Sequence, residues 1–230
     1  MKLTLNKSDL LKYVDNQAGY FFPDGIRLQG DNVNSAFELA LERCEKCFDN
    51  IILPGYHDEN GVIFSHLHSD QYATFLYYFS NSMWKNNVNP ALCSKIMYLN
   101  RALHSFFVSY KCSLPDIFAL QHPVGTVIGN AAYSDYLVIL QNVTVNTGNG
   151  ESGELCPVLG KGLYCGAGSK ILGSERVGDR VSLGVNSVVL NTRIPDDSIV
   201  INNIHSGKTE IRKRKNKECQ AQAYFKPMMI

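Results

Sequence analysis

The sequence lacks several features that would assign it to a common protein class. No run of 18 apolar residues occurs, so no membrane span is expected, and residues 1–16 hold no long apolar stretch of the secretory type. The formal net charge is only +1, which gives no reason to expect a nucleic-acid partner. The seven cysteines are odd in number and widely spread, which indicates reduced thiols in a cytoplasmic protein.

Metal ligands are also scarce. Cys44 and Cys47 form a lone CxxC without the second pair that a zinc site needs, so we expect them in core packing. His66, His68 and Asp70 lie close in sequence but have no third histidine nearby. We therefore expect no metal.

A repeat of six residues runs through residues 159–189. Its period fits neither an α-helix (3.6) nor a flat strand (2.0), but it fits a hexapeptide β-helix in which one apolar residue of each hexad points inward. Small residues, such as Ser169 and Ser187, occupy the next inward position. The apolar residues are Leu159, Cys165, Ile171, Val177, Leu183 and Val189, and the glycines that follow four of them are Gly160, Gly166, Gly178 and Gly184.

The same spacing continues upstream and then breaks. The segment 146–157 that interrupts it is glycine-rich and polar, so we expect a loop that leaves the coil. Such loops often carry function, although an insertion without a role is the alternative. The upstream residues that keep the spacing are Val127, Tyr133, Ile139 and Val145.

The rest of the chain divides into a helical part and a basic tail. We expect residues 1–104 to be mostly α-helical, 105–204 to form the β-helix, and 205–230 to be an exposed, partly disordered tail. Residues 1–30 are ambiguous. The expected helices start at Ser35, which forms a capping box with Glu38, at Asp70, and at Asn89-Pro90, and residues 53–68 are expected to be a loop.

A set of ordered motifs carries a family resemblance over roughly the last half of the chain. They are HPVGTVIG (122–129), ILQNVT (139–144), CGAGSKILG (165–173), LGVNSVVL (183–190) and IPDDSIV (194–200). This segment resembles the serine acetyltransferases of the hexapeptide-repeat acyltransferase family. The resemblance implies a mainly β fold, a left-handed parallel β-helix preceded by an α-helical domain. It also implies a trimer, with acetyl-CoA in a groove between adjacent coils and the loop closed over it.

The resemblance places a catalytic general base on His122. A thioester is already activated, so the hydroxyl of the acceptor is the weak partner, and histidine suits its deprotonation. The alternative is a turn histidine before proline. In the family an aspartate orients this base; Asp116 is the nearest candidate here, although it also reads as a turn residue after Pro115, and His104 is a further possible neighbour.

The acceptor pocket departs from the family. The serine-binding aspartate corresponds to Gln121, and the arginine-histidine pair that holds the serine carboxylate corresponds to Leu155-Cys156. Because both charged handles are missing, we expect an acceptor other than serine. A sugar hydroxyl, or an amino-sugar nitrogen, in polysaccharide biosynthesis is the main hypothesis. The expected acceptor-binding residues are Gln121, Asn142, Asn146 and Cys156.

The acetyl-CoA site and the assembly follow from the same resemblance. The cofactor positions correspond to Thr147, Gly148, Ala167 and Val185. Basic residues of the tail either contact the CoA phosphates or form a solvated run; they are Lys208, Arg212, Lys213 and Arg214. A homotrimer is expected, or a hexamer joined through the helical half. Two alternatives stay open: a serine O-acetyltransferase with a rewired pocket, and a catalytically silent trimeric scaffold.

Overall fold

The computed structural model of the chain describes residues 1–146, 156–203 and 205–227. The chain separates into two compact units. The first consists of Met1–Asp49 and Pro54–Lys111, and the second of Asn50–Leu53 and Cys112–Ile230. In the described part of the chain, no helix is both long and apolar enough to cross a bilayer.

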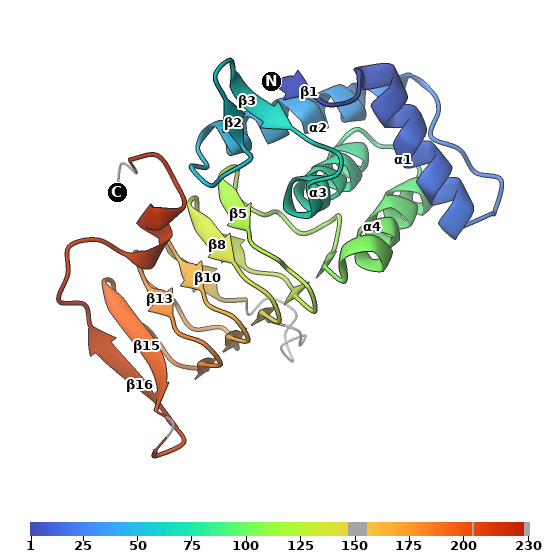
Figure 1. The fold of residues 1–230 in the computed structure, drawn as a ribbon. Helices are drawn as coiled ribbons and strands as arrows, with labels where there is room; N and C mark the ends of the chain where they lie inside the picture. Colours follow the sequence, from blue (N-terminus) through green and yellow to red (C-terminus); the bar gives the residue numbers. More distant parts are fainter. Residues whose placement is uncertain (147–155, 204, 228–230) are drawn as a thin grey trace. The chain divides into compact units, whose positions relative to one another are not determined.

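The first unit is built on helices around a buried central helix. The central helix α3 packs against both α2 and α4 and is buried from Asp70 to Met83. Phe37 of α2 meets Phe75 and Phe79 edge-on, with ring centroids 5.9 and 5.7 Å apart. The elements are β1 (Lys2–Leu3), α1 (Lys7–Phe21), α2 (Asp31–Asp49), β2 (His57–Asp58), β3 (Gly61–Phe64), α3 (Ser69–Lys85), α4 (Pro90–His104) and β4 (Phe107–Val108) (Figure 1).

Two helix starts agree with the sequence and one does not. The helices expected at Asp70 and at Asn89-Pro90 are present, and the Asn89 side chain caps α4 by accepting the Ala91 N–H at 2.9 Å. The expected capping box at Ser35 is wrong, because α2 begins one turn earlier, where the Gly30 carbonyl accepts the first helical N–H groups. The ambiguous N-terminal stretch contains α1, and the expected loop at 53–68 contains β2 and β3.

The second unit is a parallel β-helix with three faces. Face one stacks β5-β8-β11-β13-β15, face two stacks β6-β9-β12-β14, and face three pairs β7 with β10 and continues through bridges at Val177 and Ile194. Figure 1 labels β5, β8, β13 and β15 of face one, which follow one another along the unit. The strands are β5 (Phe118–Leu120), β6 (Val127–Ile128), β7 (Ala132–Tyr133), β8 (Leu137–Ile139), β9 (Thr144–Val145), β10 (Val158–Leu159), β11 (Tyr164–Cys165), β12 (Lys170–Leu172), β13 (Ser182–Leu183), β14 (Val188–Leu190), β15 (Ser198–Asn203) and β16 (Lys208–Lys213).

The interior of the coil confirms the six-residue repeat. The six apolar residues from Leu159 to Val189 are all at most 2% exposed. Cys165 pairs with Leu183, one full coil later, so these side chains form inward columns. The small residues Ser169 and Ser187 are also buried, and the Ser187 hydroxyl donates to the Gly184 carbonyl at 2.8 Å.

Upstream, one expected inward residue is wrong. Ile128, rather than Val127, is the buried residue, at 1% exposed, and it pairs with Val145. Leu120 pairs with Ile139, so the first coil has two more residues than the second before face two begins. After face two, only five residues separate Ile128 from Tyr133, which pairs with Leu159, so the inward position lies one residue later than the hexad count predicts.

The expected tail is more ordered than its charge suggests. β15 forms a further rung on β13, and β16 returns antiparallel to it, so the basic residues Lys208–Lys213 lie in a strand. Beyond it, a short 3-10 helix, η1 (Gln220–Ala223), packs with the same unit. The expectation of disorder is therefore wrong for these residues, although those of β16 are largely exposed.

Candidate active site

One corner of the β-helix, where face one turns into face two, aligns several of the predicted residues. The Asn142 N–H donates to the Val124 carbonyl, the Gly168 N–H to that of Gln141, and the Asn186 N–H to that of Ala167, each at 2.9 Å. Each coil therefore contributes one residue at the equivalent position of this corner, and these residues stack along the edge. We name Val124, Gln141, Ala167 and Val185 the corner column.

His122 lies at the first rung of this column. His122 and Pro123 are the two inserted residues of the first coil and form a bulge at the corner, in which Pro123 is buried. The His122 carbonyl accepts the Val124 N–H at 2.7 Å, and its φ of +50° is a conformation that costs a non-glycine residue roughly 1–2 kcal/mol. His122 is exposed. The bulge thus presents an imidazole at the edge along which Ala167 and Val185 follow.

The residue after each member of the column makes the turn. Gly125, Asn142, Gly168 and Asn186 all have positive φ, between +56° and +74°. Asn142 stacks on Gly125 so closely that a Cβ there would lie 2.2 Å from its Oδ1. Asn142 therefore has a structural role at this corner, since asparagine tolerates the left-handed conformation. A contact between Asn142 and the acceptor substrate, as predicted, would come in addition to this structural role.

Asn146 lies at the next corner, after face two. Its backbone N–H donates to the Ile171 carbonyl and its Nδ2 to the Asn130 carbonyl, both at 2.8 Å. Its side-chain donor thus fixes the last described residue before position 147. Cys156, on the other side of the loop, is half-buried. Thr147, Gly148 and Leu155 lie outside the described residues.

Asp116 does not come near His122 within one chain. It precedes β5, whereas His122 follows it, and the Ile117 N–H is bound by Asp135 Oδ1 at 3.0 Å. A strand rises about 3.3 Å per residue, so the backbone positions on either side of β5 are on the order of 13 Å apart. The role of Asp116 as the orienting carboxylate therefore stays a prediction.

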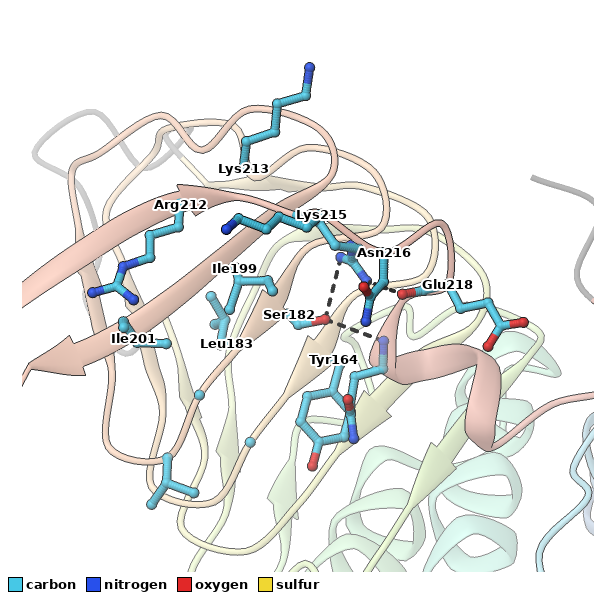
Figure 2. Close-up of a pocket in the computed structure, with 15 residues that line it drawn as sticks. Tyr164, Ser182, Leu183, Ile199, Ile201, Arg212, Lys213, Lys215, Asn216 and Glu218 are labelled. Carbon is cyan, nitrogen blue, oxygen red and sulfur yellow. Dashed lines mark hydrogen bonds between the residues drawn. The ribbon is translucent and has the colours of Figure 1, made fainter.

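A groove of about 670 Å³ lies on face one beside the corner column. Its floor contains Leu183, Ile199 and Ile201, Val185 lies at its edge, and the hairpin β15–β16 with the following segment forms the opposite wall. Figure 2 shows Lys215 extending over this groove, whereas Lys213 points away from it. The groove combines an apolar floor with a basic wall.

The basic residues of this wall are engaged to different degrees. Arg212 donates from Nε to Glu210 at 3.1 Å, and this interaction together with the Asn203 side chain lowers the pKa of Glu210. Arg214 donates to the carbonyls of Glu218 and Arg180 and holds the hairpin against the coil. Lys215 is exposed. Of the basic residues predicted to meet phosphates, Arg212, Lys213 and Arg214 line the groove; Lys215, which also lines it, was not predicted.

Two residues of the site were missed by the sequence analysis. Gln141 occupies the corner column between His122 and Ala167, and its place two residues after the inward Ile139 matches that of Ala167 after Cys165. The hexad register therefore contained the signal for it. Tyr224 donates its hydroxyl hydrogen to Gln121 Oε1, a contact over 103 positions that no local pattern indicates. Burial raises the pKa of Tyr224 to about 12.

The histidines considered for a metal have other roles. The His66 ring contacts the Thr4 hydroxyl at 2.8 Å and meets Tyr13 edge-on, and the His68 side chain accepts from the first turn of α3. Burial lowers the pKa of His104, in the first unit, to about 4. Among the described residues, no three His, Cys, Asp or Glu side chains cluster in a way that could hold a metal ion.

Comparisons with known proteins agree with this geometry. A serine acetyltransferase from Synechococcus elongatus is 33% identical over 113 residues, which cover 49% of this chain and 46% of that protein. The chain resembles the serine acetyltransferases. The predicted resemblance is confirmed, and the chain spans about half the length of that relative. No family model matches the chain.

Solved structures extend the likeness to the fold. The crystal structure of serine acetyltransferase from Vibrio cholerae has a TM-score of 0.62 at 24% identity and covers 91% of this chain and 74% of that one. A serine acetyltransferase in complex with CoA has a TM-score of 0.54 at 17% identity, with 87% and 75% covered. The shared fold supports the left-handed winding that the resemblance implied.

Proposed function

We propose that the chain is an acetyl-CoA-dependent O-acetyltransferase in which His122 is the general base. The observation that carries the proposal is the corner column, because it connects the imidazole to Ala167 and Val185 along one edge. Rungs are about 4.8 Å apart, so Val185 lies about 14 Å along the edge from the first rung. An extended pantetheine arm spans such a distance.

The two ends of this edge fit the two ends of acetyl-CoA. At one end, the groove offers an apolar floor and Lys215 for the nucleotide and its phosphates. At the other end, His122 takes the proton of the acceptor hydroxyl while that oxygen attacks the thioester carbon. The tetrahedral intermediate then expels the CoA thiolate, and the proton returns through the imidazole to the sulfur. A serine acetyltransferase in complex with CoA has the same fold, which supports this placement.

We further propose serine as the acceptor, in place of the sugar that the sequence analysis favoured. The relatives carry serine in their names, which supports the alternative hypothesis over the main one and gives no support to polysaccharide biosynthesis. A neutral sugar stays the second candidate because of one observation: Gln121, next to His122, carries no charge for an amino group. Gln121 and Cys156, which differ from the charged residues of the serine acetyltransferases, are thus the positions that would distinguish the two acceptors.

The assembly, the location and the loop residues remain part of the proposal. A homotrimer, or a hexamer of two trimers, would place one site at each interface between the β-helices of neighbouring subunits. Thr147, Gly148 and Cys156 would lie next to the bound acetyl-CoA. Sedimentation of a stable monomer would contradict this assembly. A cytoplasmic location is supported by the buried thiols; burial raises the pKa of Cys112 and of Cys165 to about 12.

The decisive experiment measures CoA release from acetyl-CoA with L-serine or methyl glucoside as acceptor. We expect turnover that falls about 10²- to 10⁴-fold in His122→Ala, with unchanged thermal unfolding. His205→Ala is the matched control, because His205 is an exposed histidine outside the corner column. Undiminished turnover in His122→Ala would reject the base, and no CoA release with either acceptor would favour the silent scaffold.

A further inference from the structure

The C-terminal residues 214–226 form a strap that runs along face one of the β-helix. It is held at its start where Arg214 donates to the Arg180 carbonyl, and further along where the Gln220 N–H contacts the Ser182 hydroxyl at 3.4 Å. At the other end the Ile52 N–H donates to the Tyr224 carbonyl at 2.9 Å, and the rings of Phe225 and Tyr136 lie 5.4 Å apart. The strap therefore connects the groove to the coil that bears His122.

Tyr224 is the residue through which the strap reaches the candidate active site. Its side chain is buried, at 9% exposed, against the ring of Tyr164 at 5.9 Å. Its hydroxyl donates to Oε1 of Gln121, which immediately precedes His122. The Gln121 backbone is fixed as well, because its N–H donates to the Ile139 carbonyl at 2.9 Å. Both the position and the rotation of this amide are therefore set.

A fixed amide has a direction. A glutamine side chain offers one carbonyl oxygen as acceptor and one NH₂ group with two donors. Because the Tyr224 hydroxyl binds the oxygen, this hydrogen bond favours the orientation in which the NH₂ group points away from Tyr224, where it can donate to a ligand. A donor beside His122 suits an oxygen of the bound molecule and disfavours an ammonium group, which has only hydrogens to present.

We propose that Tyr224 is a positioning residue that turns Gln121 into a hydrogen-bond donor, so that the acceptor substrate must present an oxygen beside its reacting hydroxyl. This inference rests on the proposed function. The shared chemistry is an oxygen acceptor, which the carboxylate of serine or a second hydroxyl of a sugar supplies. The amino group of serine would then point away from Gln121.

The test compares two small hydroxyl probes, glycerate and ethanolamine, in the full-length chain. Glycerate presents oxygens beside its hydroxyl, whereas ethanolamine presents an ammonium group, so wild type should prefer glycerate in kcat/KM. In Tyr224→Phe the amide is free to rotate, and we expect this preference to fall about 3- to 10-fold through KM, with the KM for acetyl-CoA unchanged. Gln121→Glu, which removes the donors, should reverse the preference.

Tyr136→Phe is the matched control, because it likewise removes one phenolic hydroxyl, from a ring that packs on the strap through Phe225. An unchanged preference in Tyr224→Phe, or an equal change in Tyr136→Phe, would overturn the inference. Calorimetric binding of both probes to the CoA-loaded chain reads the same preference without turnover. A chain that binds with this preference but never releases CoA would reject the proposed activity and keep the role of Tyr224. Methyl glucoside and L-serine, run in parallel, distinguish a hydroxyl from a carboxylate as the oxygen.

Discussion

Replacing Gly168 by alanine should destabilise the β-helix by about 2–3 kcal/mol, because Gly168 belongs to the turn that keeps the corner column in register. Its φ is +70°, and a Cβ would lie 2.1 Å from Asn186 Oδ1 in the next coil. The left-handed conformation costs alanine roughly 1–2 kcal/mol, and forcing Asn186 off its rotamer adds about 0.5–1.5 kcal/mol. Gly207 is the control: its φ is +66°, but nothing lies within 4 Å of its added Cβ.

The comparison isolates the contact between coils. Both glycines pay the same backbone strain and gain the same chain entropy, so the difference between the two alanine variants reports the collision with Asn186. We expect Gly168→Ala to cost about 1 kcal/mol more than Gly207→Ala in urea unfolding at one protein concentration. Adding Asn186→Gly to Gly168→Ala should recover about 1 kcal/mol as a coupling energy. Equal costs for the two alanine variants would refute the stacked-turn reasoning.

Two further predictions concern the groove and the first unit. Lys215→Glu should raise the KM for acetyl-CoA about 5- to 20-fold, but it should leave the KM for acetyl-pantetheine unchanged, because acetyl-pantetheine has no nucleotide phosphates. Lys217→Glu is the control, since Lys217 does not line this groove. Equal effects of Lys215→Glu on both thioesters would contradict the phosphate contact. The pKa of His104 lies at about 4 in the folded chain and near 6.5 when unfolded, so the unfolded state takes up the proton first and stability falls as pH drops from about 6.5 to about 4. His104→Gln should flatten this decline in melting temperature, followed by circular dichroism at 222 nm, whereas His205→Gln should not.

The sequence predicted the repeat well because a β-helix is a local structure. Each inward residue is set by a spacing of six, so Cys165 and Leu183 could be placed without knowledge of the rest of the fold. The helix start at Asn89 was equally local, since a cap residue and a proline define it. The Ser35 cap was wrong for the same kind of reason, because a good cap sequence inside a longer helix carries no sign of the earlier start at Asp31.

Residue spacing could not predict contacts between segments that are distant in the sequence. The strap brings Tyr224 to Gln121 across four coils, and no sequence pattern around either residue predicts this contact. Asp116 shows the opposite case: it is near His122 in sequence, but β5 extends between them. In an extended segment, two residues that are only six positions apart in the sequence lie far apart in space.

The corner of the first coil joins these observations. In the third coil, Cys165, Ile171 and Val177 keep the strict spacing of six, and the corner there carries only small or turn-forming residues. In the first coil two residues, His122 and Pro123, are added to that corner, and the coil remains in register on both sides of them. The insertion leaves the strand pairing on both sides unchanged and imposes a positive φ on an exposed histidine, while Pro123 beside it is buried. This departure from the repeat supports the proposed role of His122, because strained backbone conformations cluster at functional sites.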